Sequence, residues 1–145
     1  MKALGIDLGN ARTGVALSEG ILARGLCLIE ETGLRKTARR VADLALDERA
    51  DTVVIGDPLN MDGSAGEKSE RAHAFGKLLT GQLFARGLEN VRIVYQDERL
   101  TTVEAHGILH ETGNRDAGHR KKVDMLSAVL ILERFLESEK LREKD

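Results

Sequence analysis

The 145-residue sequence has little of several things that particular protein classes require. Its single cysteine, Cys27, rules out an internal disulfide and any zinc site built from several cysteines. Aromatic residues make up 3% of the chain and tryptophan is absent, which argues against binding single strands by base stacking. No apolar run is long enough to cross a bilayer. What remains is the composition of one globular domain, with 41% hydrophobic and 32% charged residues.

The charge of the chain is nearly balanced, with 22 basic residues against 24 acidic ones. That balance does not by itself indicate a nucleic-acid-binding protein, which is usually basic overall. The basic residues are nonetheless clustered, and one cluster at 115–122 comes directly before an apolar stretch. Near the amino end, Asp7 comes too early for the apolar core of a signal sequence. We therefore expect a cytoplasmic protein without a membrane association.

The hydrophobic pattern predicts an α/β protein whose elements follow the order β-β-β-α-β-α-β-α-α. The predicted strands span residues 2–8, 15–18, 24–30, 52–56 and 91–95. The predicted helices span 34–49, a segment from a Ser64–Glu67 capping box to 84, a segment from a Thr101–Glu104 capping box to 111, and 120–137. Short links make the first three strands antiparallel, and right-handed crossovers make the two later strands parallel to the first. We expect one domain at 1–138 and a charged tail at 139–145.

Three acidic residues occur at positions where the predicted sheet would carry a functional site. Asp7 interrupts the apolar first strand beside a turn of glycine and small polar residues, where an unpaired charge is costly. Glu98 follows the strand at 91–95, and the carboxyl ends of buried parallel strands carry ligand sites. The simpler alternatives are that Asp7 caps the turn and that Glu98 belongs to a charged loop.

Asp124 is the third of these acids and begins the last helix. The helix dipole favours an acid there, so capping is a strong alternative explanation. The apolar stretch that follows predicts a buried helix, which would direct Asp124 into a cleft. The preceding basic residues could neutralise a phosphate backbone, and they include Arg115, His119, Arg120 and Lys121. His119 could instead donate a proton to a leaving oxygen.

Three carboxylates at these places fit a hard cation, Mg²⁺ or Mn²⁺, better than zinc. Two such ions can stabilise both the attacking and the leaving oxygen when a phosphodiester is hydrolysed. The residues therefore predict a metal-dependent nuclease with Asp7, Glu98 and Asp124 as catalytic residues and metal ligands.

Four strings in the chain resemble the YqgF family, a bacterial Holliday-junction-resolvase-like group also described as nucleases for the 5′ end of the 16S rRNA precursor. They are GIDLG at 5–9, GDPLNMDG at 56–63, DERLTTVEA at 97–105, and KVD with SA at 122–128. The resemblance implies a ribonuclease-H-like fold, with a mixed sheet of three antiparallel strands and two parallel additions, and places the family's acids at Asp7, Glu98 and Asp124. It also implies substrate contacts at Asn10, Arg12, Thr13, Arg99 and Thr102.

Asp57 departs from the pattern that we expect of the family, which is an apolar residue at this position. Other ribonuclease-H-like nucleases place an acid at the end of the fourth strand. Asp57 could thus replace or join Glu98 as a metal ligand, and Asp97 is a further candidate. The alternative is that Asp57 and Pro58 only end the strand.

The leading hypothesis is an endonuclease that acts on structured nucleic acid, either the pre-16S rRNA 5′ end or a Holliday junction. A non-catalytic module that binds branched nucleic acid in ribosome assembly or repair is the main alternative. An actin-type ATP-binding protein is disfavoured, because the chain has one Asp-x-Gly string and half the length that fold needs. Symmetric junction cleavage would require a homodimer, whereas RNA processing would suit a monomer.

Overall fold

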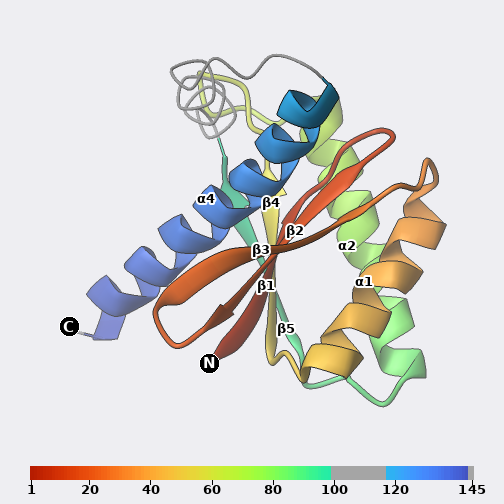
Figure 1. The fold of residues 1–145 in the computed structure, drawn as a ribbon, viewed down its shortest axis with the longest axis vertical. Coiled ribbons are helices and arrows are strands. Elements are labelled where there is room, and N and C mark those ends of the chain that lie inside the picture. Colours follow the sequence, from red (N-terminus) through yellow and green to blue (C-terminus); the bar gives the residue numbers. More distant parts are fainter. Residues whose placement is uncertain (99–116, 144–145) are drawn as a thin grey trace.

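The computed structural model describes residues 1–98 and 117–143, and for 117–124 it describes the backbone alone. One five-stranded sheet forms the centre of the molecule and has helices on both faces (Figure 1). Its strands are β1 (Lys2–Asp7), β2 (Thr13–Glu19), β3 (Leu22–Ile29), β4 (Thr52–Asp57) and β5 (Arg92–Asp97). Its helices are α1 (Leu34–Glu48), α2 (Glu67–Ala85) and α4 (Ala117–Glu143).

The strands lie in the order β3-β2-β1-β4-β5. β1, β2 and β3 form an antiparallel meander, and β4 and β5 add to it in parallel on the other side of β1. This topology confirms the predicted mixed sheet. The predicted helix that starts at the Thr101–Glu104 capping box lies outside the described residues.

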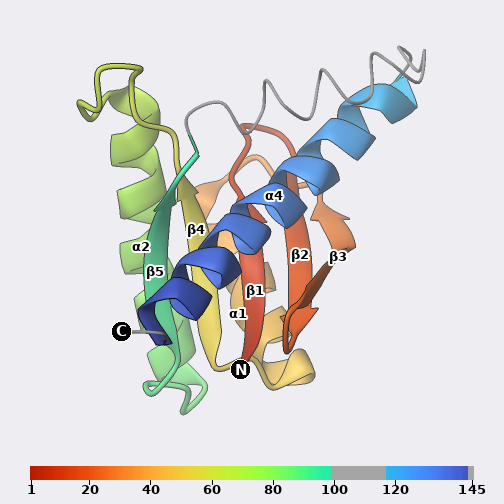
Figure 2. The same ribbon diagram turned by 90° about the vertical axis from the view of Figure 1, so that its left-hand side faces the viewer.

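The two faces of the sheet pack against different helices because side chains alternate along each strand. Helices α1 and α2 cover the face that carries large apolar side chains, among them Leu4, Ile6 and Ile55. Helix α4 crosses the other face diagonally (Figure 2), where small side chains such as Ala3 let it approach closely. At Gly5 this approach leaves no room for a side chain, since an added Cβ would lie 2.9 Å from the Ala128 carbonyl oxygen.

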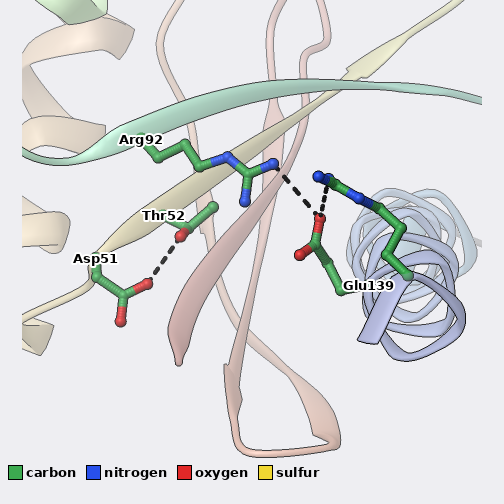
Figure 3. Close-up of polar contacts among 5 residues, drawn as sticks. Asp51, Thr52, Arg92 and Glu139 are labelled. Atoms are coloured by element: carbon green, nitrogen blue, oxygen red, sulfur yellow. Dashed lines mark hydrogen bonds and ion pairs between the residues drawn. The ribbon is translucent and has the colours of Figure 1, made fainter. Parts of the chain in front are cut away.

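Polar contacts attach the far end of α4 to the edge of the sheet (Figure 3). Arg92 of β5 donates from Nη2 to Glu139 Oε1 at 3.4 Å, and Arg142 donates to the same oxygen at 3.2 Å. Nearby, Thr52 Oγ1 donates to Asp51 Oδ1 at 2.8 Å where β4 begins. Exposed contacts of this kind contribute little stability. The position of α4 therefore depends mainly on its apolar face.

Three local expectations were wrong. Helix α2 begins at Glu67 with Gly66 as its N-cap, and Ser64 instead donates its backbone N–H and its hydroxyl to Asp62 Oδ1, at 2.9 and 2.6 Å. The Ser64 hydroxyl also accepts from Asn60 Nδ2 at 3.0 Å, so it is used within its own loop instead of accepting from a helix N–H. Strand β5 is a half-buried edge strand instead of a fully buried one. Helix α4 is longer at both ends than the predicted 120–137. No helix in the described part of the chain is long and apolar enough to cross a membrane.

Candidate active site

The parallel strands β1, β4 and β5 end at one edge of the sheet (Figure 2). A cleft lies at this edge. It has a volume of about 260 Å³ and is enclosed by the turn after β1, the end of β4, the first turns of α2 and the residue after β5. The lining residues are Asp7, Leu8, Gly9, Asn10, Gly56, Pro58, Lys68, Arg71, Ala72 and Glu98. The fold thus brings together Asp7 and Glu98, two of the three predicted catalytic acids.

Strand alternation places both acids on the face of the sheet that α4 covers. Asp7 follows Ala3 and Gly5 on that face of β1, and Gly56 follows Val54 on β4. The Glu98 carboxylate lies directly over Gly56, because a Cβ added there would be 2.7 Å from Glu98 Oε2. A glycine at this position therefore leaves the space that the carboxylate occupies.

The electrostatic state of Glu98 is unusual. Burial raises the pKa of its carboxyl group to about 9, with a further contribution from the neighbouring carboxylate of Asp7 and a smaller one from Asp57. The ammonium of Lys68 acts in the opposite direction. Glu98 Oε2 is buried and has no hydrogen-bond partner within the described residues. Because a buried oxygen without a donor is costly, this atom marks the place where a cation would be most stabilising.

Asp57 lies on the opposite face of the sheet and has partners of its own. Ser69 Oγ donates to Asp57 Oδ1 at 2.5 Å, and His73 Nε2 donates to Oδ2 at 3.0 Å. Asp57 is 8% exposed and does not line the cleft. Asp97 pairs with Asp57 in the sheet register and also lies outside the lining. Strand alternation places Asp57 and Asp97 on the face opposite Glu98, and the suggestion that either one is a metal ligand stays a prediction.

The third predicted acid, Asp124, belongs to helix α4. Only its backbone is among the parts of the chain that the structure describes. Position 124 is four residues before Ala128, which is fully buried against the sheet. Among the described residues no group of three or more His, Cys, Asp or Glu side chains could hold a metal ion. The pair Asp7 and Glu98 is therefore the described portion of the predicted site.

The predicted substrate contacts are placed unevenly. Asn10 is exposed and lines the cleft, and Arg12 is half-buried in the same turn. Thr13 is fully buried, and its hydroxyl accepts a hydrogen bond from the Gly9 N–H at 3.4 Å, so it shapes the turn instead of facing substrate. Three of the other predicted contacts lie outside the described residues: Arg99, Thr102 and Arg115. For the remaining three the structure describes only the backbone: His119, Arg120 and Lys121.

Two basic residues in the cleft, Lys68 and Arg71, were missed by the sequence analysis. Both come from the first turns of α2, and Arg71 Nη1 donates to the Gly9 carbonyl at 3.1 Å. A weak signal existed, because two basic residues three apart open a helix that follows the end of a parallel strand. They give the cleft a positive side next to its acidic pair.

The fold defines the class of protein to which the chain belongs, which is ribonuclease-H-like. Thermus thermophilus RuvC, solved in complex with a Holliday junction substrate, is 16% identical and superposes with a TM-score of 0.55, covering 90% of this chain and 91% of that one. Fowlpox virus resolvase, solved with Holliday junction DNA, is 13% identical with a TM-score of 0.59, covering 95% and 98%. At such low identity these similarities establish the fold alone.

The family model of RuvX, described as Holliday junction resolvase, matches residues 1–138, and the chain belongs to this family. Relatives named "Putative pre-16S rRNA nuclease" include one from Pelotomaculum thermopropionicum, 39% identical over 96% of this chain and 88% of the relative. Another, from Pseudomonas aeruginosa, is 39% identical over 92% of this chain and 90% of the relative. The resemblance read from the four sequence strings is confirmed, and the family is one of hydrolytic nucleases.

Proposed function

We propose that the chain is a divalent-metal-dependent endonuclease that hydrolyses phosphodiester bonds in structured nucleic acid. The observation that carries this proposal is the pair Asp7 and Glu98, which share a cleft and include a buried oxygen, Glu98 Oε2, that has no donor among the residues described. Family membership supports the same reaction class. We assign the activity to residues 1–138, with 139–145 as a charged tail.

The donor set fits a hard cation. Carboxylate oxygens are the ligands that Mg²⁺ and Mn²⁺ prefer, and a positive charge would relieve the repulsion between Asp7 and Glu98. We propose Asp124 as the third ligand, since position 124 lies one helical turn before Ala128 on the side of α4 that packs against the sheet. When bound, the cation supplies Lewis-acid activation of water and offsets negative charge on the phosphate.

The chain's own residues then orient the substrate. Asn10 and Arg12 lie in or beside the cleft and are proposed to contact the nucleic-acid backbone. The basic segment that leads into α4 is proposed to neutralise further phosphates, as are Arg99 and Thr102. By analogy with ribonuclease-H-like enzymes, the products carry 5′-phosphate and 3′-hydroxyl ends.

The 5′ end of the pre-16S rRNA is the substrate that we propose first, because relatives about 39% identical over most of the chain bear that name. A Holliday junction is the second candidate, which the family description favours. The RNA reaction requires only a monomer in the cytoplasm, whereas symmetric cleavage of a junction requires a homodimer.

The test presents both substrates to the purified chain in parallel, with Mg²⁺ and with Mn²⁺. One is a 5′-extended 16S rRNA fragment and the other a four-way DNA junction. We expect metal-dependent cleavage of one of them, and its loss in Asp7→Asn, whose circular dichroism should match the parent. An active Asp7→Asn protein would contradict the proposal. The absence of ion-dependent cleavage of both substrates would favour the non-catalytic binding module.

A further inference from the structure

The amino end of helix α2 is held by a residue outside the helix. Its N-cap, Gly66, makes no side-chain hydrogen bond. The carboxylate of Asp57, at the end of β4, instead accepts from the hydroxyl of Ser69, the third residue of the helix, at 2.5 Å. A carboxylate next to the first turn also complements the positive end of the helix dipole. Asp57 therefore fixes α2 to the sheet where the cleft begins.

A second contact, one turn later, fixes the rotation of α2 about its axis. His73 Nε2 donates to the other oxygen of Asp57 at 3.0 Å, and its ring stacks on Tyr95 with centroids 3.9 Å apart and planes inclined by 18°. The Tyr95 hydroxyl occupies the space in which Gly76 would otherwise carry a Cβ. We call Asp57, Ser69 and His73 the α2 clamp.

Ser69 and His73 of the α2 clamp lie on one side of the helix. The two basic residues of the cleft, Lys68 and Arg71, lie on the adjacent side. Lys68 precedes Ser69, and Arg71 follows Ser69 by two positions. The helical turns that the α2 clamp holds therefore also position Lys68 and Arg71 in the cleft. Arg71 uses one N–H for the Gly9 carbonyl and keeps the other donors of its guanidinium. Lys68 forms no ion pair with any residue that the structure describes, although its charge acts on Glu98.

We propose that Lys68 and Arg71 form a subsite for one phosphate of the substrate backbone beside the acidic pair, and that the α2 clamp consists of positioning residues for that subsite. The inference rests on the proposed nuclease function and adds the residues that bring the polyanion to the acids. Asp7 and Glu98 alone would repel a nucleic acid, so a strand needs adjacent positive charge in order to enter. Lys68 and Arg71 are the basic residues that the described cleft provides.

The first experiment measures binding without catalysis. The fluorescein-labelled rRNA fragment and four-way junction are titrated in EDTA across a range of salt concentrations. Because the subsite holds one phosphate, the double variant Lys68→Ala/Arg71→Ala should reduce the slope of log affinity against log salt by about 0.9, and Lys68→Ala alone should reduce it by part of that amount. The matched control is Lys77→Ala, an exposed lysine on the same helix that does not line the cleft, and it should leave the slope unchanged.

The second experiment uses steady-state cleavage to test the clamp. Ser69→Ala, and His73→Phe, which keeps a ring against Tyr95, should each raise KM about threefold to tenfold with little change in kcat. In a Lys68→Ala/Arg71→Ala background the same changes should have no further effect on KM. His73→Gln, which retains a donor for Asp57, should recover part of the loss.

The outcomes separate this inference from the proposed function. Equal salt slopes for Lys68→Ala and Lys77→Ala, or no binding by the parent chain, would overturn the subsite even if the chain cleaves. The expected slopes without metal-dependent cleavage would support the subsite and contradict the nuclease. An equal KM change from Ser69→Ala in both backgrounds would overturn the positioning role of the clamp.

Discussion

At one edge of the sheet, the carboxylates on its two faces differ in their hydrogen-bond donors. On the face that α2 covers, both oxygens of Asp57 have donors, Ser69 and His73. On the face that α4 covers, Glu98 Oε2 is buried without one within the described residues. A buried carboxylate with donors holds structure together, whereas one without donors requires a cation or a proton. The difference distinguishes an acid with a donor for each oxygen from the acid that we propose as a metal ligand, although both lie at the ends of neighbouring parallel strands.

The largest effect is expected from neutralising Glu98, whose Oε2 has no donor among the residues that the structure describes. Glu98→Gln keeps the shape of the side chain but removes a proposed metal ligand, so cleavage should fall about a thousandfold at saturating Mg²⁺ or Mn²⁺. Asp57→Asn, the matched change on the other face, should cost less than about tenfold in kcat, because Asp57 binds no cation in this scheme. Similar losses of kcat in the two variants would erase the distinction between the faces.

The space above Gly56 provides the next test. A Cβ there would lie 2.7 Å from Glu98 Oε2 and 2.6 Å from Ile131 Cδ1, so Gly56→Ala should displace the Glu98 carboxylate. We expect cleavage to fall about a hundredfold and the free energy of unfolding to fall by about 1–3 kcal/mol. Gly81→Ala on α2 is the control, because nothing lies within 4 Å of its added Cβ. That control should be neutral or slightly stabilising, and full activity in Gly56→Ala would show that Glu98 does not need this space.

Substitutions in the α2 clamp should change the free energy of unfolding more than they change the rate of cleavage. Asp57→Ala leaves the buried hydroxyl of Ser69 without its acceptor, and we expect the free energy of unfolding in urea to fall by about 2 kcal/mol. Asp43→Ala, which breaks the exposed ion pair with Arg86, should change that free energy by less than about 0.5 kcal/mol. Equal effects would mean that the hydrogen bonds of Asp57 add nothing beyond those of a surface pair.

The smallest expected effect is the pH dependence of the metal-free protein. Because the pKa of Glu98 is raised from 4.5 to about 9 by folding, the folded state binds more protons than the unfolded state between these values. Stability should therefore be fullest below the unfolded pKa and fall as the pH rises through the window. In EDTA we expect Tm to drop on the order of 5 °C from this group, and Glu98→Gln to flatten the profile.

Added metal supplies the complementary measurement. At pH 8, Mg²⁺ or Mn²⁺ should raise the Tm of the parent chain, because an ion that binds the folded state alone stabilises it. Glu98→Gln should lose most of this increase. Parallel pH profiles for the parent and Glu98→Gln in EDTA would mean that Glu98 is not the group responsible.

Much of the fold could be predicted from local patterns. Alternating and β-branched runs located all five strands within a few residues, and the short links between the first three predicted the meander. The positions of Asp7 and Glu98 at strand ends were also evident, since parallel strands carry their carboxyl ends to one edge. The Ser64 cap was wrong because the Ser64 hydroxyl accepts from Asn60 and donates to Asp62 within its own loop.

The roles of the other cleft residues depended on contacts between distant segments. Asp57 meets Ser69 and His73 only because α2 packs on β4 in one particular rotation. Arg71 of α2 donates to the carbonyl of Gly9, which lies in the turn between β1 and β2. Neither contact has a local sequence signal, so the sequence alone did not indicate which partners Asp57 and Arg71 have.

By itself, the sequence determined the order of strands and helices along the chain, the antiparallel meander and the acids that end the strands, because backbone periodicity and strand polarity are local properties that residue types encode directly. Its four motif strings determined the family. Tertiary structure alone decided that both oxygens of Asp57 have donors whereas Glu98 Oε2 has none in the described part of the chain, because that outcome depends on the helix packed against each face. The physical reason is that a carboxylate's state is set by its surroundings, and the surroundings of Asp57 and Glu98 come from opposite sides of one sheet.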